Sequence, residues 1–157
     1  ETAAFRLSAV ESLRGFPIMV FGDEGWVESG AVSRDRFGGP LPPHQVLDLY
    51  QQTRINLNLN FMQVSSTVNP RVLDMAACGA TVVTDERPEL VELFPDESCR
   101  PASFQRVDDL PDLVSTLLAK DLVDDRLELA HHVRSHHTMM HRAEWIAAEY
   151  RLFRVMQ

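Results

Sequence analysis

A run of hydroxyl-bearing side chains stands directly before a predicted helix, and this combination could hold a phosphate group. Ser65, Ser66 and Thr67 precede Asn69, a residue type that favours the position capping a helix. The first turn of a helix leaves backbone N–H groups unpaired, and the helix dipole favours an anion there. Arg71 would add a guanidinium group. The segment therefore predicts a phosphate-binding turn with free amides; the alternative is an ordinary capped helix start, because such turns are common.

Asp74 lies three residues after Arg71, about one helical turn further along, so both side chains can face the same side. A carboxylate cannot bind phosphate, but it can accept hydrogen bonds from ribose hydroxyls. The alternative is a surface ion pair between these two residues. The sequence has no Gly-x-Gly-x-x-Gly and no Gly-x-x-x-x-Gly-Lys, so we expect neither a dinucleotide site nor a P-loop.

Five of the six histidines cluster in one stretch near the C-terminus. His132 and His136, and also His137 and His141, have the spacing of two metal ligands on one helical face. No Glu stands between them as in His-Glu-x-x-His, and Thr138 is expected to break the helix between the pairs. We therefore predict no native metal site; adventitious binding of Ni²⁺ or Zn²⁺ is the alternative.

The elements that must position these residues alternate between helices and buried strands. Helices are predicted over residues 2–14, 43–50, 70–78, 88–94, 108–118, 121–136 and from 138 onward. Strands are predicted over residues 18–22, 55–61 and 81–84, with a small edge strand at 97–100. Residues 23–43 are rich in Gly and Pro and are predicted to form a long loop. This order predicts an α/β domain with a parallel sheet covered on both faces.

The composition limits the classes of protein that the chain can belong to. Its 157 residues suit one compact domain, which we expect to span residues 1–157. The net charge of −8 argues against nucleic acid as a partner, because phosphate neutralisation needs clustered Lys and Arg. No stretch reaches the roughly 18 apolar residues of a transmembrane helix, and no signal peptide is visible. With only Cys78 and Cys99 as cysteines, we expect a reducing, cytoplasmic setting.

The last predicted helix has one continuous apolar face. Met139, Ala143, Ile146, Tyr150 and Phe153 recur at intervals of four, three, four and three residues. This face could pack on the domain itself or cross to a partner domain.

One stretch resembles the donor-site signature of GT-B glycosyltransferases of the group 1 type, most closely the CgeB-like branch. It covers residues 69–85 and reads Asn-Pro-Arg-Val-Leu-Asp-Met-Ala-Ala-Cys-Gly-Ala-Thr-Val-Val-Thr-Asp. Residues 56–60 resemble the strand before that signature, and residues 89–94 resemble its Glu-Leu-x-x-x-Phe turn. His137, Thr138 and Arg142 match the closing His-Thr-x-x-x-Arg. Together these segments cover roughly residues 40 to 150, and their order is more specific than any one of them.

The resemblance implies a Rossmann-like three-layer domain that forms the C-terminal half of a GT-B fold and binds a nucleotide-sugar of the UDP or GDP type. Asp74 would bind the ribose hydroxyls, and the turn of residues 65–69 would lie at the diphosphate. The backbone near Leu41 and Pro42 would lie beside the base. GT-B enzymes need no bound metal, since a helix dipole and cationic side chains offset the charge of the leaving diphosphate.

The resemblance also implies an N-terminal acceptor domain outside this chain, which would supply the catalytic base, so no catalytic residue is named here. By itself the domain is expected to be inactive. One departure bears on activity: the related Glu-x7-Glu pattern would place a sugar-contacting Glu where Ser66 stands. A non-catalytic module for nucleotide binding or docking is therefore the alternative. A flavodoxin-like receiver ranks last, because the chain lacks the required acidic pair and Lys.

Overall fold

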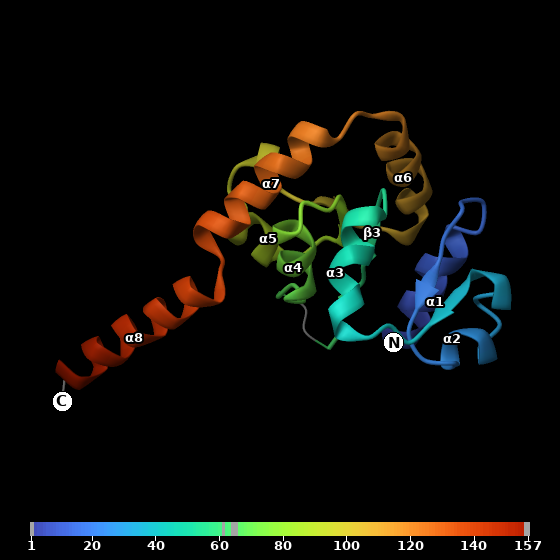
Figure 1. Cartoon of the computed structure of the whole chain (residues 1–157). Helices are drawn as coiled ribbons and strands as arrows, with labels where there is room; N and C mark the ends of the chain where they lie inside the picture. The colour runs from blue at the N-terminus through green and yellow to red at the C-terminus, as the bar shows by residue number, and fades with distance from the viewer. Residues whose placement is uncertain (1, 61, 64–65, 156–157) are drawn as a thin grey trace.

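The computed structural model describes residues 2–60, 62–63 and 66–155, which fold into alternating helices and short parallel strands (Figure 1). The helices are α1 Thr2–Ser12, α2 Gly25–Glu28, α3 Pro43–Gln52, α4 Arg71–Ala77, α5 Pro88–Leu93, α6 Leu110–Ala119, α7 Val123–His136 and α8 Met139–Val155. The strands are β1 Val20–Phe21, β2 Phe37–Gly39, β3 Asn56–Asn58, β4 Val82–Asp85 and β5 Ala102–Phe104. Short 3₁₀ helices cover Arg34–Arg36, Glu97–Cys99 and Val107–Asp109.

The central sheet has the order β3-β4-β5, and its strands are parallel. Asn58 pairs with Thr84, and Thr84 in turn pairs with Ser103. A second parallel pair joins β1 to β2, so the predicted long loop contains one short strand and α2. The predicted α/β class with a parallel sheet is confirmed.

Helices cover both faces of the central sheet, which gives three layers. Val82 belongs to the core that the sheet shares with α3, α4, α5 and α7. Val83, one residue further along β4, belongs to the core shared with α1 and α6. Phe94, just after α5, is fully buried in the first of these cores. Burying such a side chain contributes roughly 1.5–3 kcal/mol. The arrangement is that of a Rossmann-like three-layer domain.

Three predicted strands differ from the structure, and the one predicted over residues 18–22 is a strand only over Val20–Phe21. Residues 97–99 form a 3₁₀ helix instead of an edge strand, because the Asp96 side chain accepts a hydrogen bond from the Ser98 backbone N–H and closes a turn. The third strand of the sheet follows Pro101 at Ala102–Phe104 instead. The strand predicted over residues 55–61 is paired only over Asn56–Asn58. Beyond it, the backbone N–H of Asn60 bonds to the side chain of Asp85.

The last helix, α8, extends away from the rest of the domain (Figure 1). Its predicted apolar face is exposed: Met139 is 78%, Ile146 60% and Phe153 60% accessible. Of the two alternatives predicted for this face, packing on the domain itself is not found among the described residues. No helix within the described ranges is long and apolar enough to cross a membrane.

Candidate functional site

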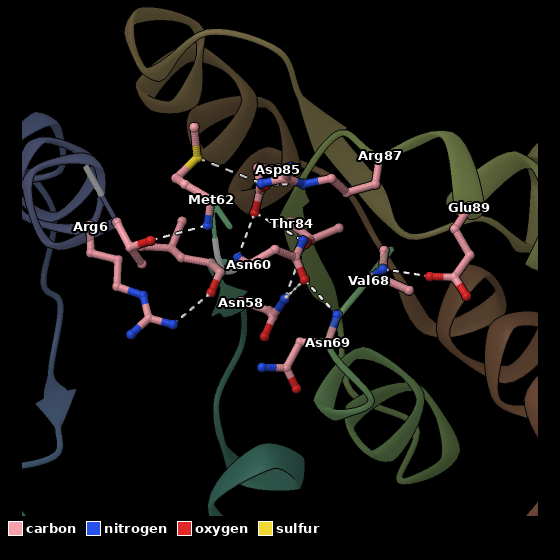
Figure 2. A network of polar contacts seen from close by, with 12 residues as sticks. Arg6, Asn58, Asn60, Met62, Val68, Asn69, Thr84, Asp85, Arg87 and Glu89 are labelled. Atoms are coloured by element: carbon pink, nitrogen blue, oxygen red, sulfur yellow. Dashed lines mark hydrogen bonds and ion pairs between the residues drawn. The ribbon is translucent and has the colours of Figure 1, made fainter. Parts of the chain in front are cut away.

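The carboxyl ends of β3 and β4 carry a group of buried polar side chains (Figure 2). Asn58 and Asn60 lie beside Thr84, and each of the three is at most 1% exposed. The Thr84 hydroxyl accepts hydrogen bonds from Nδ2 of Asn58 at 3.2 Å and Nδ2 of Asn60 at 3.1 Å. Open parallel sheets bind ligands beyond the carboxyl ends of their strands, so these polar residues lie where a site is expected.

A buried ion pair continues this group. The Asp85 carboxylate accepts from Nε of Arg87 at 2.7 Å and lies 2.6 Å from another guanidinium nitrogen of Arg87. Both side chains are 8% exposed. The other carboxylate oxygen accepts from the backbone N–H and the side-chain amide of Asn60, at 2.8 Å and 3.0 Å. We call Asn58, Asn60, Thr84, Asp85 and Arg87 the buried polar network.

One acceptor of the buried polar network remains open to a further bond. Oδ1 of Asn58 has no hydrogen-bond partner within the part of the chain that the structure describes. A buried carbonyl oxygen without a partner is costly, so this atom could accept one more N–H or O–H donor.

The turn of residues 66–69 is bonded to the sheet on one side and to α5 on the other. The Asn69 backbone N–H donates to Oδ1 of Asn60 at 2.6 Å. The Val68 backbone N–H donates to Oε2 of Glu89 at 2.6 Å, and the Glu89 N–H donates back to the Ser66 carbonyl at 3.1 Å. At the carboxyl ends of the strands, these contacts bring together Asn60 just after β3, the turn and α5.

Asn69 bonds the first turn of α4, but the helix begins one residue later than predicted, with Pro70 instead of Asn69 at the N-cap position, and the predicted free amides are not found. Oδ1 of Asn69 accepts from the backbone N–H of Arg71, the first residue of α4, at 3.0 Å. Consequently the amides of Val68, Asn69 and Arg71 are all bonded to side chains of the protein itself. Ser66, Thr67 and the Arg71 side chain are exposed. A phosphate at this turn would therefore meet hydroxyl groups and a guanidinium group in place of these three amides.

Arg71 and Asp74 both lie close to Tyr50 of α3. Burial raises the pKa of the Tyr50 hydroxyl; the charge of Arg71 opposes that rise and the charge of Asp74 adds to it. Both charged residues are exposed, and within the described ranges no ion pair joins them. The charges of both side chains thus act on the Tyr50 hydroxyl of α3.

The remaining predicted residues lie at the same end of the domain or outside the described residues. Leu41 and Pro42 immediately precede α3, which packs against α4. Figure 1 shows α3 and α4 beginning at the same end of the domain. Leu41 is half-buried and Pro42 is exposed. Ser65 lies outside the described residues.

The histidines lie where α7 ends and α8 begins. Nε2 of His132 and Nε2 of His137 both lie within hydrogen-bond distance of the Leu93 carbonyl, at 2.7 Å and 2.8 Å. The helix breaks at Thr138 as predicted, and the Thr138 hydroxyl accepts from the His141 backbone N–H at 3.4 Å. Among the described residues, no group of three or more His, Cys, Asp or Glu side chains could hold a metal ion. His132 and His137 thus join the C-terminal end of α7 to Leu93, the last residue of α5.

The side chains that form the contacts at this end of the sheet were not named as site residues from the sequence, although all except Arg87 lie in segments that resemble the family's motifs. They are Asn58, Asn60, Thr84, Asp85, Arg87 and Glu89. One signal was available: Asn is depleted in strands, so three Asn residues on one face of a short strand indicate a polar purpose for that face.

Comparison with known proteins identifies the family of the chain. A family model described as "Glycosyl transferase-like" matches residues 3–148. No curated protein and no solved structure matches the chain. Because the family match extends over nearly all of the sequence, this chain belongs to the glycosyl transferase-like family.

Proposed function

We propose that the chain is the donor-binding domain of a metal-independent GT-B glycosyltransferase of the CgeB-like branch. It would bind a UDP- or GDP-type nucleotide-sugar and present the sugar for transfer to an acceptor. The observation that carries the proposal is the turn of residues 66–69, which is fixed at the carboxyl edge of the parallel sheet. The family match supports the same reaction class.

In this proposal the diphosphate lies against the outer side of the turn. The hydroxyls of Ser65, Ser66 and Thr67 would donate hydrogen bonds to phosphate oxygens, and the Arg71 guanidinium would supply a positive charge. Positive charge and hydrogen-bond donors stabilise the negative charge that develops on the diphosphate as the bond to the sugar breaks. No metal ion or other cofactor is needed for that stabilisation.

The nucleoside would extend from the turn toward α3. Asp74, one helical turn beyond Arg71, would accept hydrogen bonds from the ribose hydroxyls. The backbone at Leu41 and Pro42, at the start of α3, would lie beside the base. This direction is supported by Tyr50 of α3, because the charges of both Arg71 and Asp74 act on its hydroxyl.

The exposed face of α8 is proposed to contact an N-terminal acceptor domain of the same protein. Trp145, Ile146, Tyr150 and Phe153 are each at least 60% exposed on this one helix. An apolar surface of this kind marks an interaction site more often than a free surface. The acceptor domain would supply the catalytic base, and none of the residues described here is assigned that role.

Nucleotide binding by the 157-residue chain tests the proposal. UDP, GDP or a related nucleotide should raise the melting temperature, since a ligand at about 100 times its Kd stabilises the folded state by about 2.7 kcal/mol. Asp74→Ala should abolish the shift, whereas Asp124→Ala, an exposed aspartate in the first turn of α7, should retain it. The absence of a shift with every nucleotide would refute the proposal.

Ser66 favours one second function, a non-catalytic module that binds nucleotide. Ser66 stands where the related signature has a sugar-contacting Glu, and a serine hydroxyl lacks the charge and the reach of a carboxylate. That module would bind nucleotide, but a protein containing both domains would not consume the nucleotide-sugar. Measuring donor turnover in such a protein separates the two functions.

A further inference from the structure

We propose that Glu89 and Asn60 are positioning residues that hold the turn of residues 66–69 in the conformation that receives the donor. The inference rests on the proposed function, because it assigns the turn to donor binding. Neither residue needs to touch the nucleotide, since both act through the backbone of the turn. The role follows from the contacts that each residue makes.

Glu89 forms two opposed bonds with the turn. Its Oε2 accepts the Val68 N–H at 2.6 Å, and its own N–H donates to the Ser66 carbonyl at 3.1 Å. The first bond has an ionised acceptor, and such bonds are shorter and stronger than neutral ones. Pro88, the first residue of α5, restricts the backbone directly before Glu89. The two bonds fix the turn at Ser66 and Val68 relative to α5.

Asn60 fixes the other end of the turn. Its Oδ1 accepts the Asn69 N–H at 2.6 Å, while its Nδ2 donates to Thr84 and to Asp85. Oδ1 also accepts from Nδ2 of Asn58 at 3.2 Å. The side chain is 1% exposed, and rotation of its amide would break all four bonds at once. Asp85 is in turn fixed by Arg87. A chain of contacts therefore runs from the buried ion pair to Asn69 (Figure 2), whose side chain accepts the backbone N–H of Arg71 at the start of α4.

Glu89 has a second conceivable role, which predicts the opposite effect. A carboxylate on the Val68 amide could occupy the place of a phosphate, and its removal would then improve nucleotide binding. The return bond from the Glu89 N–H to Ser66 favours positioning, because a displaceable anion does not require its own backbone to bond the same turn. Without Glu89 the turn must be ordered when the ligand binds, which lowers the affinity.

The test measures UDP and GDP binding by calorimetry with the full chain and three variants. Glu89→Ala should raise Kd about tenfold, equivalent to about 1.4 kcal/mol, without a matching loss in melting temperature. Glu89→Gln keeps a side-chain oxygen that can accept the Val68 N–H, so it should restore most of the affinity. Glu92→Ala, an exposed glutamate on the same helix, should bind as the unmodified chain does.

Amide hydrogen exchange gives a second measurement. The Val68 amide should exchange faster in Glu89→Ala, while the amides of β4 should not change. If Glu89→Ala binds as well as the unmodified chain, or more tightly, the positioning role is overturned while the proposed function stands. If the unmodified chain binds neither nucleotide, the proposed function fails and the positioning role fails with it.

Discussion

The buried polar network and the α8 helix depart from the usual distribution of side chains in opposite directions. The network places an aspartate, an arginine and two asparagines in the interior of the domain. The helix α8 places tryptophan, tyrosine, phenylalanine and isoleucine on the surface. Buried polar groups and exposed apolar patches are the more informative observations, because exposed polar and buried apolar groups are the ordinary case.

The two regions differ in whether their side chains find partners within the same domain. In the buried polar network nearly every donor and acceptor bonds to a side chain or backbone group of the same chain. Such a network specifies one local structure and holds it rigidly. The apolar face of α8 finds no cover among the described residues of the domain. The network therefore fixes a site inside this chain, whereas α8 is suited to a surface contact with another domain.

The largest effect on stability is expected at the buried ion pair, where two charged side chains are almost completely removed from solvent. Asp85→Ala should lower the free energy of unfolding by about 3–5 kcal/mol, because it leaves Arg87 charged and buried beside two unsatisfied Asn60 donors. The matched control is Asp108→Ala, which removes the exposed ion pair with Arg106. That change should cost at most about 1 kcal/mol. Urea unfolding of both variants checks the prediction. Equal losses in the free energy of unfolding would show that the buried ion pair contributes no more than an exposed one.

A smaller effect is expected at the connection between α7 and α8. The pKa of His137 is lowered, first because the ring is partly buried and further because His132, His136 and Arg142 lie close to it. The folded state therefore binds fewer protons than the unfolded state. This contribution to stability is present above the unfolded pKa, about 6.5, and is lost as the pH falls from there through the folded pKa.

His137→Gln should make the loss of stability between pH 7 and pH 5 shallower, because one group that resists protonation has been removed. Thermal unfolding at several pH values measures it. His131→Gln is the control, since that residue is exposed on α7. An unchanged pH profile in His137→Gln would mean that the fall in stability comes from other groups.

The comparison also shows what the sequence could and could not predict. In residues 55–61 apolar residues alternate with Asn, a pattern typical of a strand, and the structure has a strand there over Asn56–Asn58. The helix predicted over residues 70–78 is present as Arg71–Ala77 and is followed by Gly79 with a φ of +75°. Alternating polar residues usually face solvent, so the pattern did not predict that Asn58 and Asn60 are buried.

The contacts that fix the turn could not be predicted from local patterns. Asn60 and Asn69 meet only because the intervening residues fold back, and Val68 meets Glu89 only because β4 places α5 beside the turn. Likewise, periodicity predicted an apolar face on the last helix but did not predict whether anything covers it. Long-range packing decides both questions, and a single sequence does not record it.

The smallest effect on stability is expected from polar substitutions on α8, because its apolar face is exposed. Ile146→Ser with Phe153→Ser should change the free energy of unfolding of the 157-residue chain by no more than about 0.5 kcal/mol, as for other exposed positions. Both side chains are already 60% exposed, so little contact is lost.

A loss as large as that of Asp85→Ala would mean that the face is covered in solution. If that loss grew with protein concentration, the cover would be a second copy of the chain, since only association makes stability depend on concentration. A loss independent of concentration would instead mean that α8 folds back onto its own domain, and the proposed contact with an acceptor domain would have to be abandoned.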